Sequence, residues 1–446
     1  MPIEPRRRIR YLTSAQIIIL GFFSIILLGA LLLMLPLSAK CGRITPFSKT
    51  LFTATSAVCV TGLVVVDTGS YWSAFGQTVI LLLIQIGGLG VITVASLFTM
   101  LSHQKISLMQ RSIMQDAISA PQVGGVVRLT RFILRGTILI ELLGAFFLLP
   151  VFLRDYGIRG VWMALFHSVS AFCNAGFDLL GTSAAPFVSI SSYVGNPVVN
   201  LTIMLLIILG GLGFLTWNDI YTWRFRIHRY RLQSKIILTA TAFLILLPAV
   251  FFFFEDLSSL PLQSRILASL LQSVTMRTAG FNTVELSKMS GPSQAIQIVL
   301  MLIGGSPGST AGGIKTTTFV VLLANFIATI FQKEDAQMFG RRMEESAVKT
   351  AATIFFMYAA LFFTGAVILS VYERLPLSAC LYETASAVGT VGVTLGITPK
   401  LHLLSQLVLI ALMFLGRVGA LTLIFAAIST RTHSFAKLPQ EKIAVG

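Results

Sequence analysis

The amino-acid sequence predicts an all-α membrane protein in which four pseudo-symmetric helix–pore loop–helix repeats surround one central pore. Three observations lead to this fold class. Only 11% of the 446 residues are charged, whereas about a quarter are charged in an average globular protein. Several apolar runs reach the roughly 20 residues that cross a bilayer as a helix. Finally, one order of segments recurs four times along the chain, and internal repeats of this kind determine the architecture.

Each repeat is expected to contain two membrane-spanning helices. The first long apolar run begins at Ile17 and ends at Leu37, and the length of the chain fits about eight such spans in one membrane domain. The first spans of the repeats are expected at 15–37, 132–153, 235–254 and 349–371, and the second spans at 76–100, 199–223, 294–330 and 404–429.

Between the two spans of each repeat lies a segment that is too short to cross the membrane. The four segments are expected near 47–58, 161–172, 264–275 and 377–388, and they align without gaps when one glycine is used as the anchor. The four anchors are Gly62, Gly176, Gly280 and Gly392. Irregular backbone at membrane depth is tolerated only where it is buried in protein or lines water. The sequence therefore predicts four re-entrant loops around a shared axis.

The basic residues predict the orientation of the chain. Most of the 33 Lys and Arg lie near the two ends and in the segments 103–135, 224–235 and 333–349. Cytoplasmic loops carry an excess of Lys and Arg, so both termini are expected in the cytoplasm of a multi-pass bacterial inner-membrane protein. The expected divisions are a cytoplasmic N-terminus at 1–14, repeat 1 at 15–102, repeat 2 at 103–223, repeat 3 at 224–332, repeat 4 at 333–430 and a cytoplasmic C-terminus at 431–446.

The residues next to the anchors suit a site for a dehydrated monovalent cation. Rings of backbone carbonyls replace the water of such an ion, whereas anion pores use rings of Arg or Lys. Glycine accepts the left-handed dihedrals that turn successive carbonyls toward one axis, and the short helix before it would point its negative end at the ion. The expected filter residues are Val58, Cys59, Val60, Thr61, Gly62, Cys173, Asn174, Ala175, Gly176, Arg277, Thr278, Ala279, Gly280, Gly389, Thr390, Val391 and Gly392.

Several motifs resemble the Trk/Ktr/HKT superfamily of potassium transporters, and the resemblance covers nearly the whole chain. Beside the four anchors, these motifs are MRTAGFNT at 276–283, GGSPGSTAGGIKTTT at 304–318 and GRVG at 416–419. The plain eight-span layout is similar to the Ktr-type membrane subunit. The resemblance implies four repeats folded within one chain and K⁺ as the transported ion. Glycine at all four anchors is the potassium-like pattern of that family, in which Ser at the first anchor would indicate sodium.

The resemblance also implies partners. It predicts a homodimer of this chain and a cytoplasmic ring of nucleotide-binding regulatory subunits. No cofactor is expected in this chain, so the nucleotide (ATP/ADP or NAD) would belong to the ring. The basic segment 224–235 would dock this ring or anionic membrane lipids, and solvated membrane anchoring explains its charge equally well.

The second spans differ from one another beneath the anchors. Gly88, Gly211 and Gly305 occupy the place that Arg417 takes in the fourth repeat. A cation near mid-membrane usually marks function, so we expect Arg417 in a gate or constriction, with capping of backbone carbonyls as the structural alternative. The glycine-rich run of the third repeat cannot continue a helix comfortably, and the resemblance implies that it forms a movable loop below the filter. The expected gate residues are Gly304, Gly305, Ser306, Pro307, Gly308, Ser309, Thr310, Ala311, Gly312, Gly313, Lys315 and Arg417.

A further cation lies close to an anchor. Arg277 precedes Gly280 by three residues, where a free charge would oppose cation flow. We therefore expect its side chain to turn away from the axis and to pair with Glu383 or Glu285. The buried-type polar residues elsewhere in the spans and short helices are interpreted as structural rather than as a proton relay; they are Glu141, His167 and Asp219.

Other classes of function fit the sequence less well. A cation-coupled secondary symporter for a small solute is the main alternative, but its usual signature is a pair of broken helices in inverted halves. Here the sequence predicts one broken second span and four repeats in the same orientation. An enzyme is not expected, because no nucleophile, acid pair or metal set has workable spacing. Nucleic-acid binding is also not expected, because the basic residues alternate with apolar spans.

Overall fold

The structure is a computed structural model that describes residues 13–91, 93, 108–117, 125–419 and 441. Each repeat begins with a long apolar helix. These four helices are the ones in the described part of the chain that are long and apolar enough to cross a membrane on their own. They are α1 (Ser14–Met34), α7 (Val126–Tyr156), α11 (Leu232–Glu255) and α15 (Glu345–Glu373).

A short helix follows in each repeat and packs against the long helix before it. The short helices are α2 (Phe47–Val58), α8 (Arg159–Phe172), α12 (Leu262–Thr275) and α16 (Leu377–Gly389). Their bounds agree with the predicted short segments to within about two residues, because the apolar run and the anchor glycine fix both ends. The last residues of these helices are buried, which places the ends nearest the anchors inside the protein.

The second spans are α4 (Ala74–Leu89), α9 with α10 (Pro197–Gly211 and Phe214–Trp223), α13 with α14 (Gly291–Leu302 and Thr316–Ile330) and α17 (Leu403–Val418). The prediction that one second span is broken was wrong. The third is interrupted as expected, but α9 and α10 also meet at a bend of 98°. Gly213, at the bend, has a φ of +86°, a conformation that costs glycine little and other residues more.

Smaller elements lie in the connections. The helical elements among them are η1 (Pro36–Ser38), α3 (Thr68–Tyr71), α6 (Leu108–Ala117), η2 (Ser191–Tyr193), η3 (Ile227–Arg229), η4 (Leu286–Lys288) and η5 (Thr398–Lys400). A two-stranded antiparallel hairpin of β1 (Gln337–Met338) and β2 (Arg341–Arg342) joins α14 to α15.

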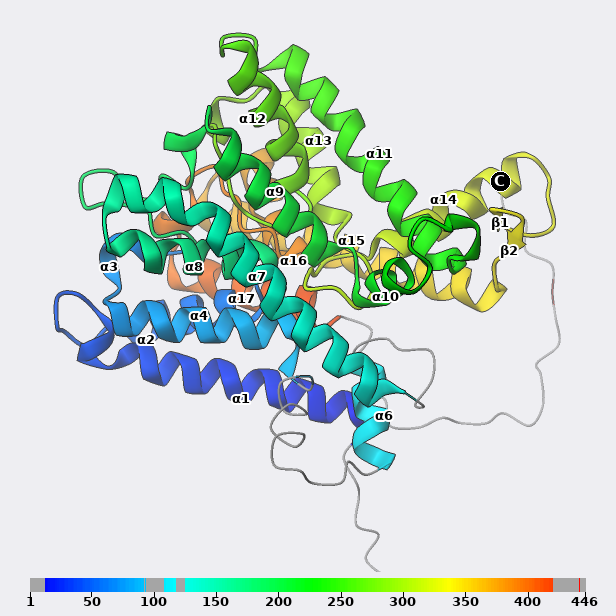
Figure 1. Ribbon diagram of the computed structural model, residues 1–446, viewed down its shortest axis with the longest axis horizontal. Coiled ribbons are helices and arrows are strands. Elements are labelled where there is room, and N and C mark those ends of the chain that lie inside the picture. The colour runs from blue at the N-terminus through cyan, green and yellow to red at the C-terminus, as the bar shows by residue number, and fades with distance from the viewer. Residues whose placement is uncertain (1–12, 92, 94–107, 118–124, 420–440, 442–446) are drawn as a thin grey trace, which may run out of the picture.

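The repeats pack in a closed ring, as expected for four helix–loop–helix units around one axis. The second span of each repeat contacts the short helix of the next repeat: α4 contacts α8, α9 contacts α12, and α13 contacts α16. The ring closes because α17 of the fourth repeat contacts α2 of the first. Figure 1 shows this closure, with the red α17 lying beside the blue helices of the first repeat.

Glycine also makes close helix contacts possible within a repeat. A Cβ atom on Gly87 would overlap the backbone carbonyl of Val58, the last residue of α2. Gly210 meets the carbonyl of Phe172 in the same way, and Gly416 meets that of Val388. In the first, second and fourth repeats this glycine therefore lets the second span lie directly against the end of its own short helix, where any side chain would push the two apart. In the third repeat Gly304 instead contacts the carbonyl of Gly312, within its own loop.

Candidate ion pathway

The four anchor glycines meet in one ring. A Cβ atom on Gly62 would lie 2.5 Å from the carbonyl oxygen of Ala175, and one on Gly176 would lie 2.6 Å from that of Ala279. A Cβ atom on Gly280 would lie 2.5 Å from the carbonyl oxygen of Val391, and one on Gly392 would overlap the carbonyl oxygen of Thr61. Each anchor thus faces a backbone carbonyl of the next repeat in cyclic order. The ring has room for glycine and for no larger residue without a shift of backbone.

The backbone alternates in the same way in all four loops. The anchors have φ values of +90°, +68°, +88° and +94° at Gly62, Gly176, Gly280 and Gly392. The residues two positions before them are also left-handed, and they are Val60, Asn174, Thr278 and Thr390, with φ of +54°, +58°, +73° and +53°. Sequence reasoning missed this second set, since none of its members is glycine. Non-glycine residues hold such dihedrals only where the surrounding structure over-determines them.

Hydroxyl groups of the short helices hold two of the anchors. The amide of Gly62 donates to the Ser56 hydroxyl at 3.0 Å, and the amide of Gly392 donates to that of Ser386 at the same distance. In the second repeat the Ser170 hydroxyl donates instead to the carbonyl of Phe177, at 2.7 Å. The Ser that recurs six residues before these three anchors therefore fixes the backbone beside each of them.

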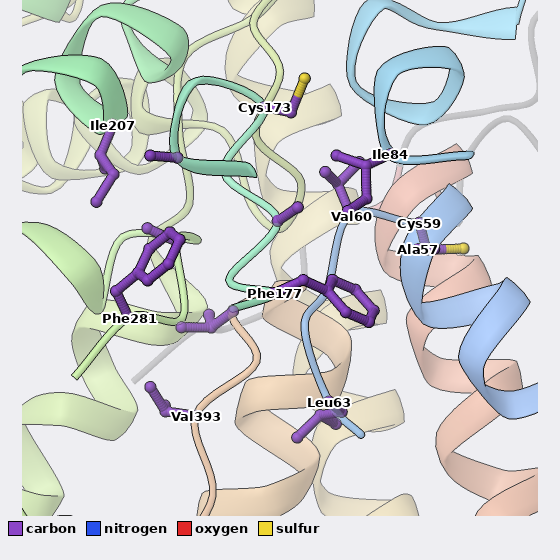
Figure 2. Packing of buried hydrophobic residues seen from close by; sticks show 14 of the residues in the cluster. Ala57, Cys59, Val60, Leu63, Ile84, Cys173, Phe177, Ile207, Phe281 and Val393 are labelled. Atoms are coloured by element: carbon purple, nitrogen blue, oxygen red, sulfur yellow. The ribbon is translucent and has the colours of Figure 1, made fainter. Parts of the chain in front are cut away.

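The residue after each anchor points into a common apolar cluster. Leu63, Phe177, Phe281 and Val393 occupy equivalent positions, and each is at most 2% exposed. Figure 2 shows these four side chains on separate strands of the ring region, together with Val60 and Cys173. Burial of their side chains holds the strands in place from behind.

On one side of the ring the four anchors line a cavity of about 420 Å³. Three acidic residues and one basic residue also line it: Asp67, Asp178, Glu285 and Lys400. The Lys288 ammonium lies 2.5 Å from the Glu285 carboxylate and lowers the pKa of that group, which stays ionised at neutral pH. We call this cavity the vestibule. Its carboxylates attract cations to the ring, while Lys288 and Lys400 offset part of that charge.

On the other side of the ring lies the glycine-rich run of the third repeat. Its two ends are joined by a parallel bridge between Ile303 and Ile314, so residues 304–313 form a closed loop. The Thr310 hydroxyl donates to the carbonyl of Phe172 at 3.1 Å, next to the second candidate filter strand. A Cβ atom on Gly312 would overlap the side chain of Thr390 in the fourth strand. The loop therefore touches two of the four strands from below.

Arg417 connects this loop to another repeat. Its guanidinium donates to the carbonyl oxygens of Thr310 in the loop and of Gly87 and Gly88 at the end of α4, the last at 3.0 Å. Charge-assisted hydrogen bonds of this kind are stronger than neutral ones. The ammonium of Lys315 donates to the carbonyl of Ala311 at 2.7 Å. Both cations that the sequence associates with a gate thus bind the loop directly, and Arg417 caps carbonyls as the structural alternative foresaw.

The expected ion pair of Arg277 does not form. The Glu383 carboxylate accepts from the hydroxyls of Thr394 and Thr398, and Glu285 pairs with Lys288. The guanidinium of Arg277 donates instead to the Thr316 hydroxyl at 3.2 Å. The prediction of an acidic partner was wrong because hydroxyls of its own repeat already satisfy Glu383.

The three polar residues interpreted as structural from the sequence have hydrogen-bond partners. The Glu141 carboxylate accepts from Gln85 Nε2 at 3.2 Å, and Asp219 accepts from the hydroxyl of Ser234 at 2.7 Å. One ring nitrogen of His167 lies 2.7 Å from the carbonyl of Met163. These contacts are consistent with the structural roles expected of them.

Four membrane repeats whose re-entrant loops meet in one ring define a membrane transport protein of the four-repeat type. The sequence profile of the TrkH family, described as a cation transport protein, matches residues 6–438. The chain therefore belongs to the TrkH family of cation transport proteins, which confirms the predicted superfamily and its fold class.

Two relatives are similar over their whole length. The potassium/sodium uptake protein NtpJ of Enterococcus hirae is 39% identical over 458 residues, which cover 100% of both chains. The Ktr system potassium uptake protein B of Bacillus subtilis is also 39% identical, over 97% of this chain and 95% of its own. Among solved structures, the potassium transporter TrkH from Vibrio parahaemolyticus superposes with a TM-score of 0.72 at 16% identity, covering 94% of this chain and 86% of that one. At this identity the last likeness shows the fold alone.

Proposed function

We propose that the chain is the pore-forming membrane subunit of a potassium-uptake system in the bacterial cell membrane. The single observation that carries this proposal is the ring of four anchors, each facing a carbonyl of the next repeat. Membership in a family of cation transport proteins argues against the organic-solute symporter. The names of the relatives, one a potassium and one a potassium/sodium uptake protein, support an alkali cation as the substrate.

The selectivity filter of this proposal consists of backbone carbonyls. Left-handed residues alternate with ordinary ones at two positions in each loop, and such alternation turns successive carbonyls to the same side of a strand. The carbonyl oxygens replace the hydration shell of a potassium ion. The acidic vestibule supplies the ion, and the membrane potential drives it inward with about 2.3 kcal/mol per charge at 100 mV.

In this proposal the loop of residues 304–313 is the gate, and hydrogen bonds from Arg417 and Lys315 hold it in place. The loop contacts the filter strands from below, where it would obstruct an ion that has passed them. Opening requires the loop to leave this position. Release of Arg417 from the carbonyls of Thr310 and Gly87 would accompany that movement.

Sodium is the second candidate ion, because one relative is a potassium/sodium uptake protein. We favour potassium, because glycine at all four anchors is the potassium-like pattern of the superfamily that the sequence resembles. Replacement of Gly62 by Ser would bring a side chain to within 2.5 Å of the Ala175 carbonyl. We expect Gly62→Ser to weaken the discrimination against sodium, and unchanged selectivity would remove this loop from the filter.

Regulation is proposed to come from partner chains. Relatives of the Ktr type belong to systems, as their names state. We propose a homodimer of this chain and a cytoplasmic ring of regulatory subunits that binds ATP/ADP or NAD. Phe225 and Ile227 lie exposed among the arginines of the segment 224–235, so this segment offers both apolar and basic contacts to the ring or to anionic lipids.

The decisive test is potassium uptake by the chain itself. The complete gene would be expressed with its regulatory partner in a strain without its own uptake systems, and growth at low potassium and ⁸⁶Rb⁺ influx would be measured. Influx that depends on the chain is expected. Absence of influx with correctly inserted protein would overturn the proposal.

The gate has a separate test. Deletion of residues 305–312 removes the loop and joins Gly304 directly to Gly313. High influx without the regulatory partner is expected from this variant. A silent pore, with normal insertion and with an active parent chain, would argue against the gate while leaving the filter untouched.

A further inference from the structure

A buried cation lies beside the third candidate filter strand. Arg277 is only 8% exposed, and it forms no ion pair with an acidic side chain in the part of the chain that the structure describes. A charge at membrane depth is costly unless it is paired or hydrogen bonded, and such residues usually serve a function. The C-terminal end of α12, which stops at Thr275, supplies a favourable negative dipole to this cation.

The hydrogen bonds of Arg277 lead away from the filter and into the loop. Its Nη2 donates to the Thr316 hydroxyl at 3.2 Å, and this hydroxyl donates to the carbonyl of Gly304 at 3.0 Å. The amide of Thr316 donates to the carbonyl of Gly305, also at 3.0 Å. Three consecutive contacts therefore join a filter strand to the first residues of the loop.

Thr316 occupies the point where the loop becomes a helix again. It is the first residue of α14 and is fully buried. Because its backbone and its side chain both bind the opposite end of the loop, the loop cannot leave its place without disturbing Thr316. The hydrogen bond between Arg277 and the Thr316 hydroxyl therefore depends on the position of the loop.

This arrangement is confined to the repeat that carries the loop. The positions equivalent to Arg277, three residues before each anchor, hold Cys59, Cys173 and Gly389 in the other repeats. None of these side chains can donate hydrogen bonds as a guanidinium does. A cation at this position and the glycine-rich loop of residues 304–313 thus occur together in one repeat of four.

A small cavity lies beside this chain of hydrogen bonds, between the third filter strand and the loop. Arg277, Gly305 and Thr241 line it.

We propose that Arg277 and Thr316 form a relay that couples the position of the loop to the geometry of the third filter strand. Arg277 is a positioning residue in this relay and does not contact the ion. When the loop is in place, Thr316 holds the guanidinium and thereby the strand from Arg277 to Gly280. When the loop leaves, the strand loses this support and its selectivity changes. This inference rests on the proposed function, because it assumes that the ring is a filter and the loop a gate.

The test uses three single variants in the full-length chain, assayed with and without the regulatory partner. Thr316→Val preserves the shape of the side chain but removes the acceptor for Arg277 and the donor to Gly304. Thr316→Ser keeps the hydroxyl. Thr317→Val changes the neighbouring threonine, which is outside the relay, and is the matched control.

Two quantities are measured in proteoliposomes: partner-independent ⁸⁶Rb⁺ flux, and the ratio of sodium to potassium permeability. Thr316→Val is expected to raise both by about threefold to tenfold, the effect that loss of one or two buried hydrogen bonds produces. Thr316→Ser is expected to restore both values, and Thr317→Val to leave them unchanged. A role in folding alone would alter the amount of protein without altering the permeability ratio.

A double-mutant cycle with Arg277→Met completes the test. If the relay exists, the double variant Arg277→Met/Thr316→Val changes the permeability ratio no more than the stronger single variant, because both substitutions break one connection. Additive effects would overturn the relay, as would an unchanged ratio in Thr316→Val. If the chain without residues 305–312 still conducts constitutively in the same assay, that failure concerns the relay and not the proposed gate.

Discussion

In the ring, four strands of dissimilar sequence adopt one backbone conformation, whereas the second spans, which share one motif, leave the ring in three different ways. We call the short helix and strand of each repeat its outer half and the second span its inner half. Val60 and Thr390 share a left-handed φ with Asn174 and Thr278, although the side chains differ in size and polarity. Below the ring, α4 and α17 reach Gly90 and Gly419, α9 bends by 98° at Gly213, and α13 leads into the loop.

The comparison separates two kinds of constraint. The ring depends on backbone atoms that meet across repeats, so its conformation is shared and its side chains vary. The inner half depends on what each second span meets as it leaves the ring, so equivalent glycines lead to different paths. Selectivity is therefore expected to reside in what the repeats have in common, and control in what distinguishes them.

The largest effect is expected at an anchor. Gly392→Ala would place a Cβ atom against the Thr61 carbonyl at a φ of +94°. Backbone strain of this kind costs about 1–3 kcal/mol, and the ring must open to relieve it. We expect potassium influx to fall at least about tenfold, which corresponds to about 1.4 kcal/mol, as measured by ⁸⁶Rb⁺ uptake at matched protein levels.

Gly291→Ala provides the control for this substitution, since no atom lies within 4 Å of a Cβ built there. Normal influx through Gly392→Ala would mean that the ring does not surround the ion path, and the comparison between outer and inner halves would lose its functional meaning.

The next effect is expected at Arg417, the residue that distinguishes the fourth inner half. Arg417→Gln removes charge-assisted hydrogen bonds to Thr310, Gly87 and Gly88, and such bonds contribute about 1.5–3 kcal/mol. Partner-independent influx should rise about tenfold or more. Arg374→Gln, at an exposed arginine after α15, is the control. If Arg417→Gln lowers influx in the presence of the partner and leaves it low without the partner, Arg417 is a structural cap and does not hold the gate closed.

Alanine substitutions at Gly90 and Gly213 test why the GGLG motif of the first and second repeats leads to different paths of the second span. Gly90 and Gly213 have φ values of +87° and +86°, but a Cβ on Gly213 would lie 2.7 Å from the Pro307 carbonyl, whereas one on Gly90 has open space nearby. Both alanine variants bear the strain of a left-handed residue, about 1–2 kcal/mol. Gly213→Ala should have a lower melting temperature in detergent than Gly90→Ala by several degrees. Equal melting temperatures would show that the loop does not press on the bend.

The smallest effect is expected behind the ring. Ser56→Ala and Ser386→Ala each remove the hydroxyl that accepts from an anchor amide. One hydrogen bond contributes about 1 kcal/mol, so the ratio of sodium to potassium permeability should rise about twofold to fivefold. The third repeat has Val274 at this position, and the ring tolerates that. Ser346→Ala, at an exposed serine near the start of α15, should have no effect. A strong loss of influx in either ring variant would show that the hydroxyls support the fold as well as the filter.

Much of the outer half could be predicted from the sequence. The short helices at Phe47–Val58 and Leu377–Gly389 begin where predicted and end within one residue of the prediction, because an apolar run followed by an anchor glycine determines both bounds. The left-handed φ of Val60 could not be predicted in this way. Closure of the ring imposes it against the local preference of a β-branched residue, and no local pattern records such closure.

The inner half was predicted less completely. The GGLG pattern of α4 is repeated in α9, yet the bend at Gly213 depends on the loop residues that pack against it, and these come from another repeat. The partner of Arg277 was also beyond prediction. Glu383 seemed available from its position in the sequence, but two threonine hydroxyls bind its carboxylate in the fold. The boundaries of the repeats and the identity of the filter and gate residues stay predictions.

The bridge between Ile303 and Ile314 has a consequence for how this span tolerates change in length. The entropy needed to close a loop grows only slowly with its number of residues, by about 0.6 kcal/mol for each doubling. The bridge holds the end of α13 beside the start of α14, so the segment between them projects from the span as a side branch while it still connects the two helices along the chain. Insertions in this branch would increase the obstruction to the ion in graded steps and leave the two helices in register.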